Sequence, residues 1–227
     1  MGGRTPSFAV QWDVPTGPMH SNLRQLRHNV DIEKILSRHA HSEDRFIPDY
    51  EELRLVTEEL KSRGLRIVLT QGVYDLLHEG HARYLEKALA EGDVLIVGVD
   101  TDEFTRVRKG PNRPVVPFQE RLNMLSHLRH VSILTKRDVD IPIGALIEIV
   151  RPHVLVTSES TKDFPPQDVC VYQKYCEKVI ILPPQATTST TARIRMLSIE
   201  GADQLARDLA ERIPRAVQES LDKMRGM

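Results

Sequence analysis

The sequence predicts an α/β domain built on a parallel sheet. Five short runs rich in aliphatic residues recur along the middle of the chain, and those at 67–69 and 94–99 are typical of strands that are buried on both faces. Between these runs lie segments in which apolar residues recur at helical spacing. Strands that alternate with helices in this way are typical of a parallel sheet that is covered by helices on both sides.

The N-terminal part, residues 1–47, is predicted to be an arm followed by a helical extension. Glycine and proline punctuate residues 1–19, which indicates a loose segment. Ser21 can cap a helix over residues 22–38, because a partial apolar stripe follows it. The polar residues 39–47 are interpreted as a linker.

Residues 48–199 are predicted to form the main domain. It opens with a helix over residues 50–63, which Gly64 ends. The strands are expected at residues 67–69, 94–99, 131–134, 154–156 and 179–182. Further helices are expected at residues 81–91, 118–128, 144–150, 168–177 and 190–197, and a loop rich in Arg, Lys, Gly and Pro at residues 106–117. The predicted fold is therefore a Rossmann-like three-layer α/β/α domain with a five-stranded parallel sheet, plus N- and C-terminal helical extensions.

Residues 200–227 are predicted to form a C-terminal helical tail. Apolar residues recur there at helical spacing, at Leu205, Leu209, Ile213, Val217 and Leu221. Pro214 marks the start of a new helix. The apolar stripe could pack on the domain or on a second subunit, and the sequence leaves both possibilities open.

The charges nearly cancel, since 31 Lys and Arg stand against 32 Asp and Glu and give a formal net charge of −1. This balance argues against a protein that binds nucleic acid over its whole surface. No segment is apolar enough for a membrane span or a secretory signal. Cys170 and Cys176 are too few for a disulfide framework, so we expect reduced thiols in a cytoplasmic protein without nucleic-acid or membrane partners.

The first candidate site follows the first strand, because parallel sheets bind ligands outside the carboxyl ends of their strands. In Gly72–His81, His78 and His81 flank a Glu-Gly pair where a helix begins. A helix N-terminus favours phosphate, and Gly80 lets a ligand approach the backbone. The two imidazoles could donate hydrogen bonds to a phosphoryl group as it gains charge. The alternative is a pair of histidines that local hydrogen bonds satisfy.

The fifth strand leads into five hydroxyl residues, Thr187–Thr191, ahead of an apolar helix. One of them could simply cap that helix, but the run exceeds what a cap needs. It lies at a second helix N-terminus on the same edge of the sheet. Thr188, Ser189, Thr190 and Thr191 are therefore predicted to bind phosphate.

The loop after the second strand carries Arg106, Arg108, Lys109 and Arg113. Such loops are often only solvated surface, but this one lies on the same edge as two predicted anion sites, which favours a phosphate clamp. The chain has no Walker-type loop and no GxGxxG after the first strand. Three segments are thus predicted to bind phosphate, and the sequence shows no obvious nucleophile. This combination indicates electrostatic catalysis at a nucleoside triphosphate.

At these residues the chain resembles the nucleotidyltransferase superfamily with the His-x-Gly-His motif, in its cytidylyltransferase-like branch. The motif Gly-x-(Phe or Tyr)-Asp-x-x-His-x-Gly-His is matched by Gly72, Tyr74, Asp75, His78, Gly80 and His81, and the Ser-Thr-Thr run by Ser189, Thr190 and Thr191. The related adenylyltransferases for pantetheine phosphate and nicotinamide mononucleotide usually have proline two residues before the first histidine. Leu76 stands there and argues against them.

Over residues 48–196 the chain is most similar to the adenylyltransferase domain of bacterial ADP-heptose synthesis. The resemblance rests on the helix at 50–63, on Lys109-Gly110-x-x-Arg113-Pro114-Val115 and on Pro117-x-x-x-Arg121. Glycerol-3-phosphate cytidylyltransferases match the first motif equally well. They usually carry Arg-Thr-x-Gly-Ile before Ser-Thr-Thr, and that arginine is missing here.

Two departures from the family pattern keep alternatives open. Residues 157–161 replace the Gly-Asp turn that usually lies near the base, so the base is left undecided, and Thr187 stands where the family usually has glycine. A CTP-dependent transferase acting on glycerol 3-phosphate or another polyol phosphate is therefore one alternative. A nucleotide-binding sensor or scaffold without turnover is another, although the intact histidine motif and Lys109 favour an enzyme.

The resemblance implies transfer of a nucleotidyl group from an NTP, with ATP favoured, to a sugar phosphate such as heptose 1-phosphate, with release of pyrophosphate. The implied catalytic residues are His78, His81 and Lys109. The implied nucleotide-binding residues are Gly72, Val73, Tyr74, Gly80, Thr188, Ser189, Thr190 and Thr191. The implied acceptor-binding residues are Asp75, Asp102, Arg113 and Arg121.

Three of these residues have a structural alternative. Arg121 could equally be a surface charge on a helix, Asp75 could orient the turn, and Asp102 could cap a helix. Mg²⁺ is expected to bind through the phosphates of the NTP, without a metal site made by the protein alone. The resemblance also implies a homodimer.

Overall fold

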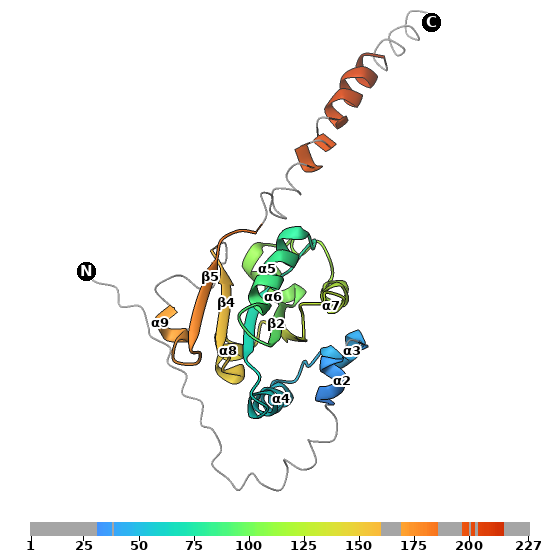
Figure 1. Ribbon diagram of the computed structural model, residues 1–227. Helices are drawn as coiled ribbons and strands as arrows, with labels where there is room; N and C mark the ends of the chain where they lie inside the picture. Colours follow the sequence, from blue (N-terminus) through green and yellow to red (C-terminus); the bar gives the residue numbers. More distant parts are fainter. Residues whose placement is uncertain are drawn as a thin grey trace, which may run out of the picture.

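The computed structural model describes residues 31–37, 39–159, 169–185, 197–199, 201–202 and 204–215. Its centre is a five-stranded sheet in which every pair of neighbouring strands is parallel. The strands are β1 (Ile67–Gly72), β2 (Val94–Asp100), β3 (Ile133–Arg137), β4 (Val154–Ser158) and β5 (Lys178–Leu182). They lie in the order β3-β2-β1-β4-β5 (Figure 1), which confirms the predicted Rossmann-like α/β fold.

Helices cover both faces of the sheet (Figure 1). The helices are α2 (Ile32–Leu36), α3 (Ser42–Arg45), α4 (Tyr50–Ser62), α5 (Glu79–Leu89), α6 (Asp102–Lys109), α7 (Phe118–Ser126), α8 (Ala145–Val150) and α9 (Val169–Tyr172). One hydrophobic cluster joins the sheet to α2, α4 and α8, and a second joins it to α5 and α7. Because side chains alternate along a strand, Ile67 and Leu69 enter the first cluster and Val68 enters the second.

The helix before β1 has the start and the stop that its sequence predicts. The carboxylate of Asp49 accepts a hydrogen bond from the backbone N–H of Glu52 at 2.8 Å and so caps α4. Gly64 follows the helix with φ of +80°, a conformation that glycine adopts without strain.

The predicted loop over residues 106–117 begins later than expected. Residues up to Lys109 belong to α6, which Thr101 caps by accepting a hydrogen bond from the N–H of Phe104. Phe104 and Thr105 are buried and anchor this short helix, although its other side chains are largely polar. The helix ends at Gly110, whose φ is +98°.

The predicted linker over residues 39–47 is wrong in part, because this segment holds α3 and packs against the sheet. The N–H of Ile47 donates to the carbonyl of Leu134 at 2.8 Å, and Phe46 forms an isolated parallel bridge with the same residue. Ile47 is buried in the first hydrophobic cluster together with Ile32 and Ile35 of α2. The segment from α2 onward therefore shares the core of the main domain.

The remaining expectations about the ends of the chain are tested only in part. Residues 1–30 and most of the expected helix 190–197 lie outside the described residues, and α9 is shorter than the helix predicted over 168–177. Residues 204–215 are helical, with Leu205, Leu209 and Ile213 exposed. No helix among the described residues is both long and apolar enough to cross a membrane.

Candidate active site

The strand order places a ligand crevice next to β1. The chain runs outward from β1 to β2 and β3, then returns to β4 on the other side of β1. This reversal makes a topological switch point between β1 and β4, where open parallel sheets bind ligands outside the carboxyl ends of their strands. The histidine motif follows β1 directly and therefore lies at this switch point.

The turn from β1 into α5 contains two residues in the left-handed region, Tyr74 with φ of 54° and Leu76 with φ of 46°. Proline cannot stand at position 76 in this conformation, because its ring fixes φ near −65°. The ring of Tyr74 folds back over Gly72, so that a Cβ on Gly72 would lie 3.2 Å from Tyr74 Cε2. Tyr74 also packs edge-on against His81, with ring centroids 5.7 Å apart.

The two histidines cap the first turn of α5 together. His78 is the N-cap residue, and its Nδ1 accepts a hydrogen bond from the N–H of Gly80 at 3.0 Å. The Nδ1 of His81 accepts from the N–H of His78 at 3.4 Å. The two rings lie against each other with centroids 4.1 Å apart. The local hydrogen bonds that were considered as an alternative are thus present, and both of them are made by Nδ1 of the ring.

These contacts fix the tautomer of both imidazoles. A nitrogen that accepts a hydrogen bond carries no proton, so in the neutral ring the proton resides on Nε2. Burial, followed by the neighbouring His78, lowers the pKa of His81 to about 4. His81 is therefore neutral at pH 7, and its Nε2–H can act as a donor.

Asp75 joins the turn after β1 to the loop after α6. Its carboxylate, 3% exposed, accepts hydrogen bonds from the N–H groups of Val115 at 3.0 Å and Val116 at 2.9 Å. The Nε of Arg113 lies 3.4 Å from the same carboxylate. This arrangement agrees with the role of orienting the turn, since both oxygens already hold the loop that carries Arg113.

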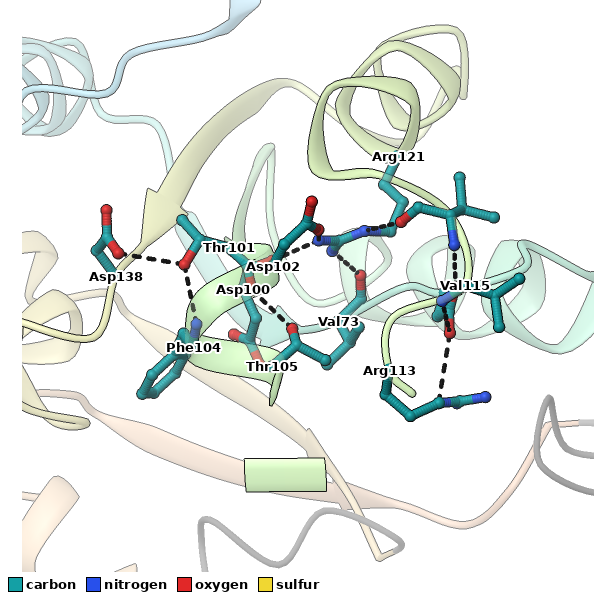
Figure 2. A network of polar contacts seen from close by, with 12 residues as sticks. Val73, Asp100, Thr101, Asp102, Phe104, Thr105, Arg113, Val115, Arg121 and Asp138 are labelled. Atoms are coloured by element: carbon teal, nitrogen blue, oxygen red, sulfur yellow. Dashed lines mark hydrogen bonds and ion pairs between the residues drawn. The ribbon is translucent and has the colours of Figure 1, made fainter. Parts of the chain in front are cut away.

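Arg121 is not a surface charge, since its side chain is fully buried. Its guanidinium donates to the backbone carbonyls of Val73, Asp100 and Val116, and to the carboxylate of Asp102 at 2.8 Å (Figure 2). These contacts engage all three of its nitrogens and support a structural role, and the predicted contact of Arg121 with the substrate stays a prediction. The residue instead links the ends of β1 and β2 to the loop before α7.

A second ion-pair cluster, missed from the sequence, lies where β2 and β3 end. Asp100, whose side chain is 1% exposed, pairs with Arg108 of α6 at 2.8 Å and with Arg137 of β3 at 3.4 Å. Both guanidinium groups lie over the ring of Phe104, at 4.9 Å and 5.1 Å from its centroid. The sequence signal that could have revealed this cluster is Asp100, a charged residue at the end of the otherwise apolar strand β2.

Lys109 differs from the other predicted cations. Arg108, Arg113 and Arg121 each pair with a carboxylate, whereas Lys109 at the end of α6 forms no ion pair with a described residue. Partial desolvation lowers the pKa of its ammonium group, an effect that the charge of Asp100 opposes. Lys109 therefore has capacity left for a phosphate, and so does Arg106, which is exposed and also forms no ion pair with a described residue.

The predicted hydroxyl run, Thr188, Ser189, Thr190 and Thr191, lies outside the described residues. The structure therefore brings together the histidine motif, Asp75, Asp102, Arg113 and Lys109 at the carboxyl edge of the sheet. It does not test whether the hydroxyl run joins them.

Comparison with known proteins identifies the family. The cytidylyltransferase-like family model matches residues 69–198, which is more than half of the chain. The chain belongs to the cytidylyltransferase-like family. The predicted class of enzyme, a nucleotidyltransferase, is confirmed by this membership.

Curated relatives match the same region. The bifunctional protein HldE of Geotalea uraniireducens is 37% identical over 169 residues, which cover 71% of this chain and 34% of that protein. HldE of Aliarcobacter butzleri is 34% identical over 184 residues, or 80% of this chain and 37% of that protein. The chain thus spans about a third of the length of these relatives.

A solved structure with a similar sequence is the lipopolysaccharide core biosynthesis protein from Thermoplasma volcanium GSS1. It is 27% identical and superposes with a TM-score of 0.45, over 53% of this chain and 97% of that chain.

Proposed function

We propose that this protein transfers the nucleotidyl group of an NTP, preferably ATP, to the phosphate of a sugar phosphate such as heptose 1-phosphate, and releases pyrophosphate. The observation that carries the proposal is the pair of imidazoles at the N-terminus of α5, each with its Nδ1 turned to the backbone. The relatives named HldE and the resemblance to adenylyltransferases of ADP-heptose synthesis support the choice of ATP and of the sugar phosphate.

In the proposed reaction, an oxygen of the acceptor phosphate attacks the α-phosphorus of the NTP. A new bond forms between that oxygen and the α-phosphorus, the bond from the α-phosphorus to the bridging oxygen breaks, and pyrophosphate leaves. The Nε2–H groups of His78 and His81 donate hydrogen bonds to the α-phosphoryl oxygens as these gain charge. Lys109 neutralises phosphate charge, and Ser189 and Thr190 hold the β- and γ-phosphates.

Mg²⁺ is proposed to bind through the oxygens of the triphosphate. Within the described ranges, no three His, Cys, Asp or Glu side chains come together in a way that could hold a metal ion. Asp75, the nearest candidate in the motif, already accepts hydrogen bonds from Val115 and Val116. When bound, the metal would supply charge neutralisation for the phosphates. The homodimer and the cytoplasmic location remain proposals.

A substrate panel tests the proposal. ATP, CTP, GTP and UTP are each combined with heptose 1-phosphate, other sugar phosphates and glycerol 3-phosphate, and pyrophosphate release is measured. We expect the fastest release with ATP and a sugar 1-phosphate. Fastest release with CTP and glycerol 3-phosphate would establish the cytidylyltransferase alternative. Binding of an NTP without pyrophosphate from any pair would establish the non-catalytic sensor or scaffold.

A further inference from the structure

Asp100 is a buried carboxylate at the carboxyl end of β2, beside the candidate active site. Its side chain is 1% exposed, and it forms ion pairs with Arg108 of α6 at 2.8 Å and with Arg137 of β3 at 3.4 Å. The burial of charged groups costs free energy that their pairing only partly returns, so apolar side chains of similar volume are often at least as stabilising. A carboxylate in this place therefore indicates a role other than stability.

The ion pair with Arg108 holds the last turn of α6. Thr101 caps the start of this helix by accepting from the N–H of Phe104 (Figure 2). The end of the helix has little apolar support, because Val107 is 71% exposed. Arg108 lies one turn beyond Phe104 on the same face, and its guanidinium lies 4.9 Å from the centroid of that ring. The guanidinium therefore reaches back along the helix to Asp100 and holds the last turn against the end of β2.

Arg137 holds the same helix from the neighbouring strand. Its guanidinium lies 5.1 Å from the centroid of the Phe104 ring, and it shares the carboxylate of Asp100 with Arg108. The aromatic ring of α6 therefore contacts two guanidinium groups that pair with one carboxylate. Through these contacts Asp100 fixes the position of α6 relative to both β2 and β3.

Lys109, the last residue of α6, is the group that this arrangement orients. Successive residues of a helix point about 100° apart, so a fixed Arg108 also fixes the direction of Lys109. Desolvation lowers the pKa of Lys109, and the negative charge of Asp100 opposes this effect. After burial and His78, the positive charge of Lys109 is a further cause of the lowered pKa of His81. Lys109 therefore lies close enough to both Asp100 and the histidine motif for their charges to interact.

We propose that Asp100 is a positioning residue that holds the ammonium group of Lys109 toward the phosphates of the NTP, an inference that rests on the proposed function. Asp100 does not touch the substrate in this role, because its carboxylate is buried and pairs with Arg108 and Arg137. It acts through Arg108 on the direction of Lys109, and through its own charge on the protonation of Lys109. A cation is thereby kept in a partly desolvated place, where its attraction to phosphate is stronger than in water.

A double-mutant cycle on nucleotide binding tests this assignment. ATP with Mg²⁺ (or CTP, if wild type binds it more tightly) is titrated calorimetrically into wild type, Asp100→Asn, Lys109→Ala and the double variant. We expect each single substitution to weaken binding about tenfold, and the double variant to bind as weakly as Lys109→Ala alone. A loss of about 100-fold in the double variant would overturn the assignment, because Asp100 would then act independently of Lys109. Binding by Asp100→Asn equal to that of wild type would also overturn it.

The pH dependence of nucleotide binding is a readout that a merely structural role would not change. The charged groups that act on the pKa of Lys109 are Asp100, Arg113, Arg108 and Asp75. Affinity should fall at alkaline pH as Lys109 loses its proton. Asp100→Asn removes a charge that favours the ammonium form and should move this fall to lower pH by about one unit, whereas Arg108→Met should move it to higher pH. An unchanged midpoint in both variants would overturn the assignment.

Lys61→Met is the control for a general loss of stability. The Lys61 ammonium donates to the carbonyls of Val150 and Arg151, at the opposite edge of the sheet from the candidate active site. This variant should melt earlier than wild type but bind the nucleotide as wild type does. A loss of affinity in Lys61→Met as large as in Asp100→Asn would overturn the assignment, because lower stability alone would then explain both.

Arg108→Met provides a second route to the same answer if Asp100→Asn does not fold. It leaves Asp100 paired with Arg137 and releases only the last turn of α6. We expect it to weaken nucleotide binding about tenfold when Lys109 is present and to have no further effect when Lys109 is alanine. An equal loss with and without Lys109 would overturn the assignment.

Calorimetric titration keeps this inference apart from the proposed function, because binding needs no turnover. Coupling between Asp100 and Lys109 in nucleotide binding supports the role of Asp100 even if no pyrophosphate is released. Normal pyrophosphate release by wild type, together with additive losses in the cycle, rejects the role of Asp100 and leaves the proposed transferase standing. Failure of wild type to bind any of the four NTPs would overturn both.

Discussion

The Nδ1 atoms of His78 and His81 each accept a backbone N–H at the start of α5, so each ring in its neutral form holds its proton on Nε2. The helix thereby positions its own catalytic donors, since the same bonds that cap it also set the ring orientation. A donor that is already oriented needs no rearrangement when charge develops on a phosphoryl oxygen, which is the condition for strong electrostatic catalysis.

The first prediction concerns the loss of one of these donors. His81→Ala removes the Nε2–H, and kcat should fall about 100-fold, as for the loss of one preorganised donor to a developing oxyanion. Pyrophosphate release with the preferred substrates measures this change. His127→Ala is the control, because His127 is exposed at the end of α7. Activity of His81→Ala within about threefold of wild type would refute the role given to His81.

The second prediction concerns pH. The pKa of His81 is lowered from 6.5 in the unfolded chain to about 4 in the folded protein, so the unfolded state binds the proton more readily between these values. The contribution of His81 to stability is therefore complete above pH 6.5 and is lost as the pH falls toward 4. Titration of the His81 ring by NMR should give a midpoint near 4. A midpoint at or above 6.5 would contradict the neutral donor.

The third prediction separates a structural Arg121 from a phosphate contact. Arg121→Met leaves three backbone carbonyls and Asp102 without their donor, so the free energy of unfolding should fall by about 3–5 kcal/mol. Denaturant unfolding measures this change. Arg83→Met is the control, since Arg83 makes only an exposed ion pair with Glu79 and should cost less than about 1 kcal/mol. Unchanged stability with a raised KM for ATP would restore Arg121 as a substrate contact.

At the scale of elements, the site is held together by hydrogen bonds and ion pairs between loops that follow different strands. Asp75 holds the loop after α6. Arg121 holds the ends of β1 and β2 (Figure 2). Thr101 caps α6 and also donates to Asp138 after β3 at 3.2 Å. The motif residue Asp75 therefore acts on the site through the loop that carries Arg113.

The fourth prediction tests the hydrogen bonds that join Asp75 to this loop. Asp75→Asn replaces one acceptor oxygen by an NH₂ group that faces the N–H groups of Val115 and Val116. The loop over residues 110–117 should open more often, at a cost of about 1–3 kcal/mol in local stability. Hydrogen exchange at Val115 and Val116 should accelerate, while exchange in β2 stays as in wild type. Equal protection of both loop amides in the variant and in wild type would contradict the role of Asp75 in holding this loop.

The strands were predictable because each contains a run of apolar residues, although β3 (Ile133–Arg137) extends beyond the predicted 131–134 into polar residues, and Gly64 marked the end of α4 correctly. The helix α6 was missed because only Phe104 and Thr105 of its residues are buried, so its sequence resembles a charged loop. The position of Arg121 was undecided because its four partners come from three separate segments. Such long-range pairing leaves no local signal in the sequence.

At the scale of the whole molecule, the net charge is −1, and most charges at the carboxyl edge of the sheet are also balanced by opposite charges. The sequence suggested a cluster of cations for phosphate, yet Arg108, Arg113 and Arg121 are paired with Asp100, Asp75 and Asp102. The ion pairs build the edge, and the histidines of the motif and Lys109 are the groups proposed to contact the substrate. A site of this kind suits one small triphosphate better than an extended polyanion.

Phosphorus NMR of the reaction tests the central claim most directly. The protein is incubated with ATP, Mg²⁺ and heptose 1-phosphate, and the phosphorus signals of substrates and products are followed together. Attack at the α-phosphorus predicts that a sugar nucleotide with a new phosphoanhydride (P–O–P) linkage and pyrophosphate appear in equal amounts as ATP disappears. Formation of ADP or inorganic phosphate without the sugar nucleotide, or no consumption of ATP with any tested acceptor, would contradict the account.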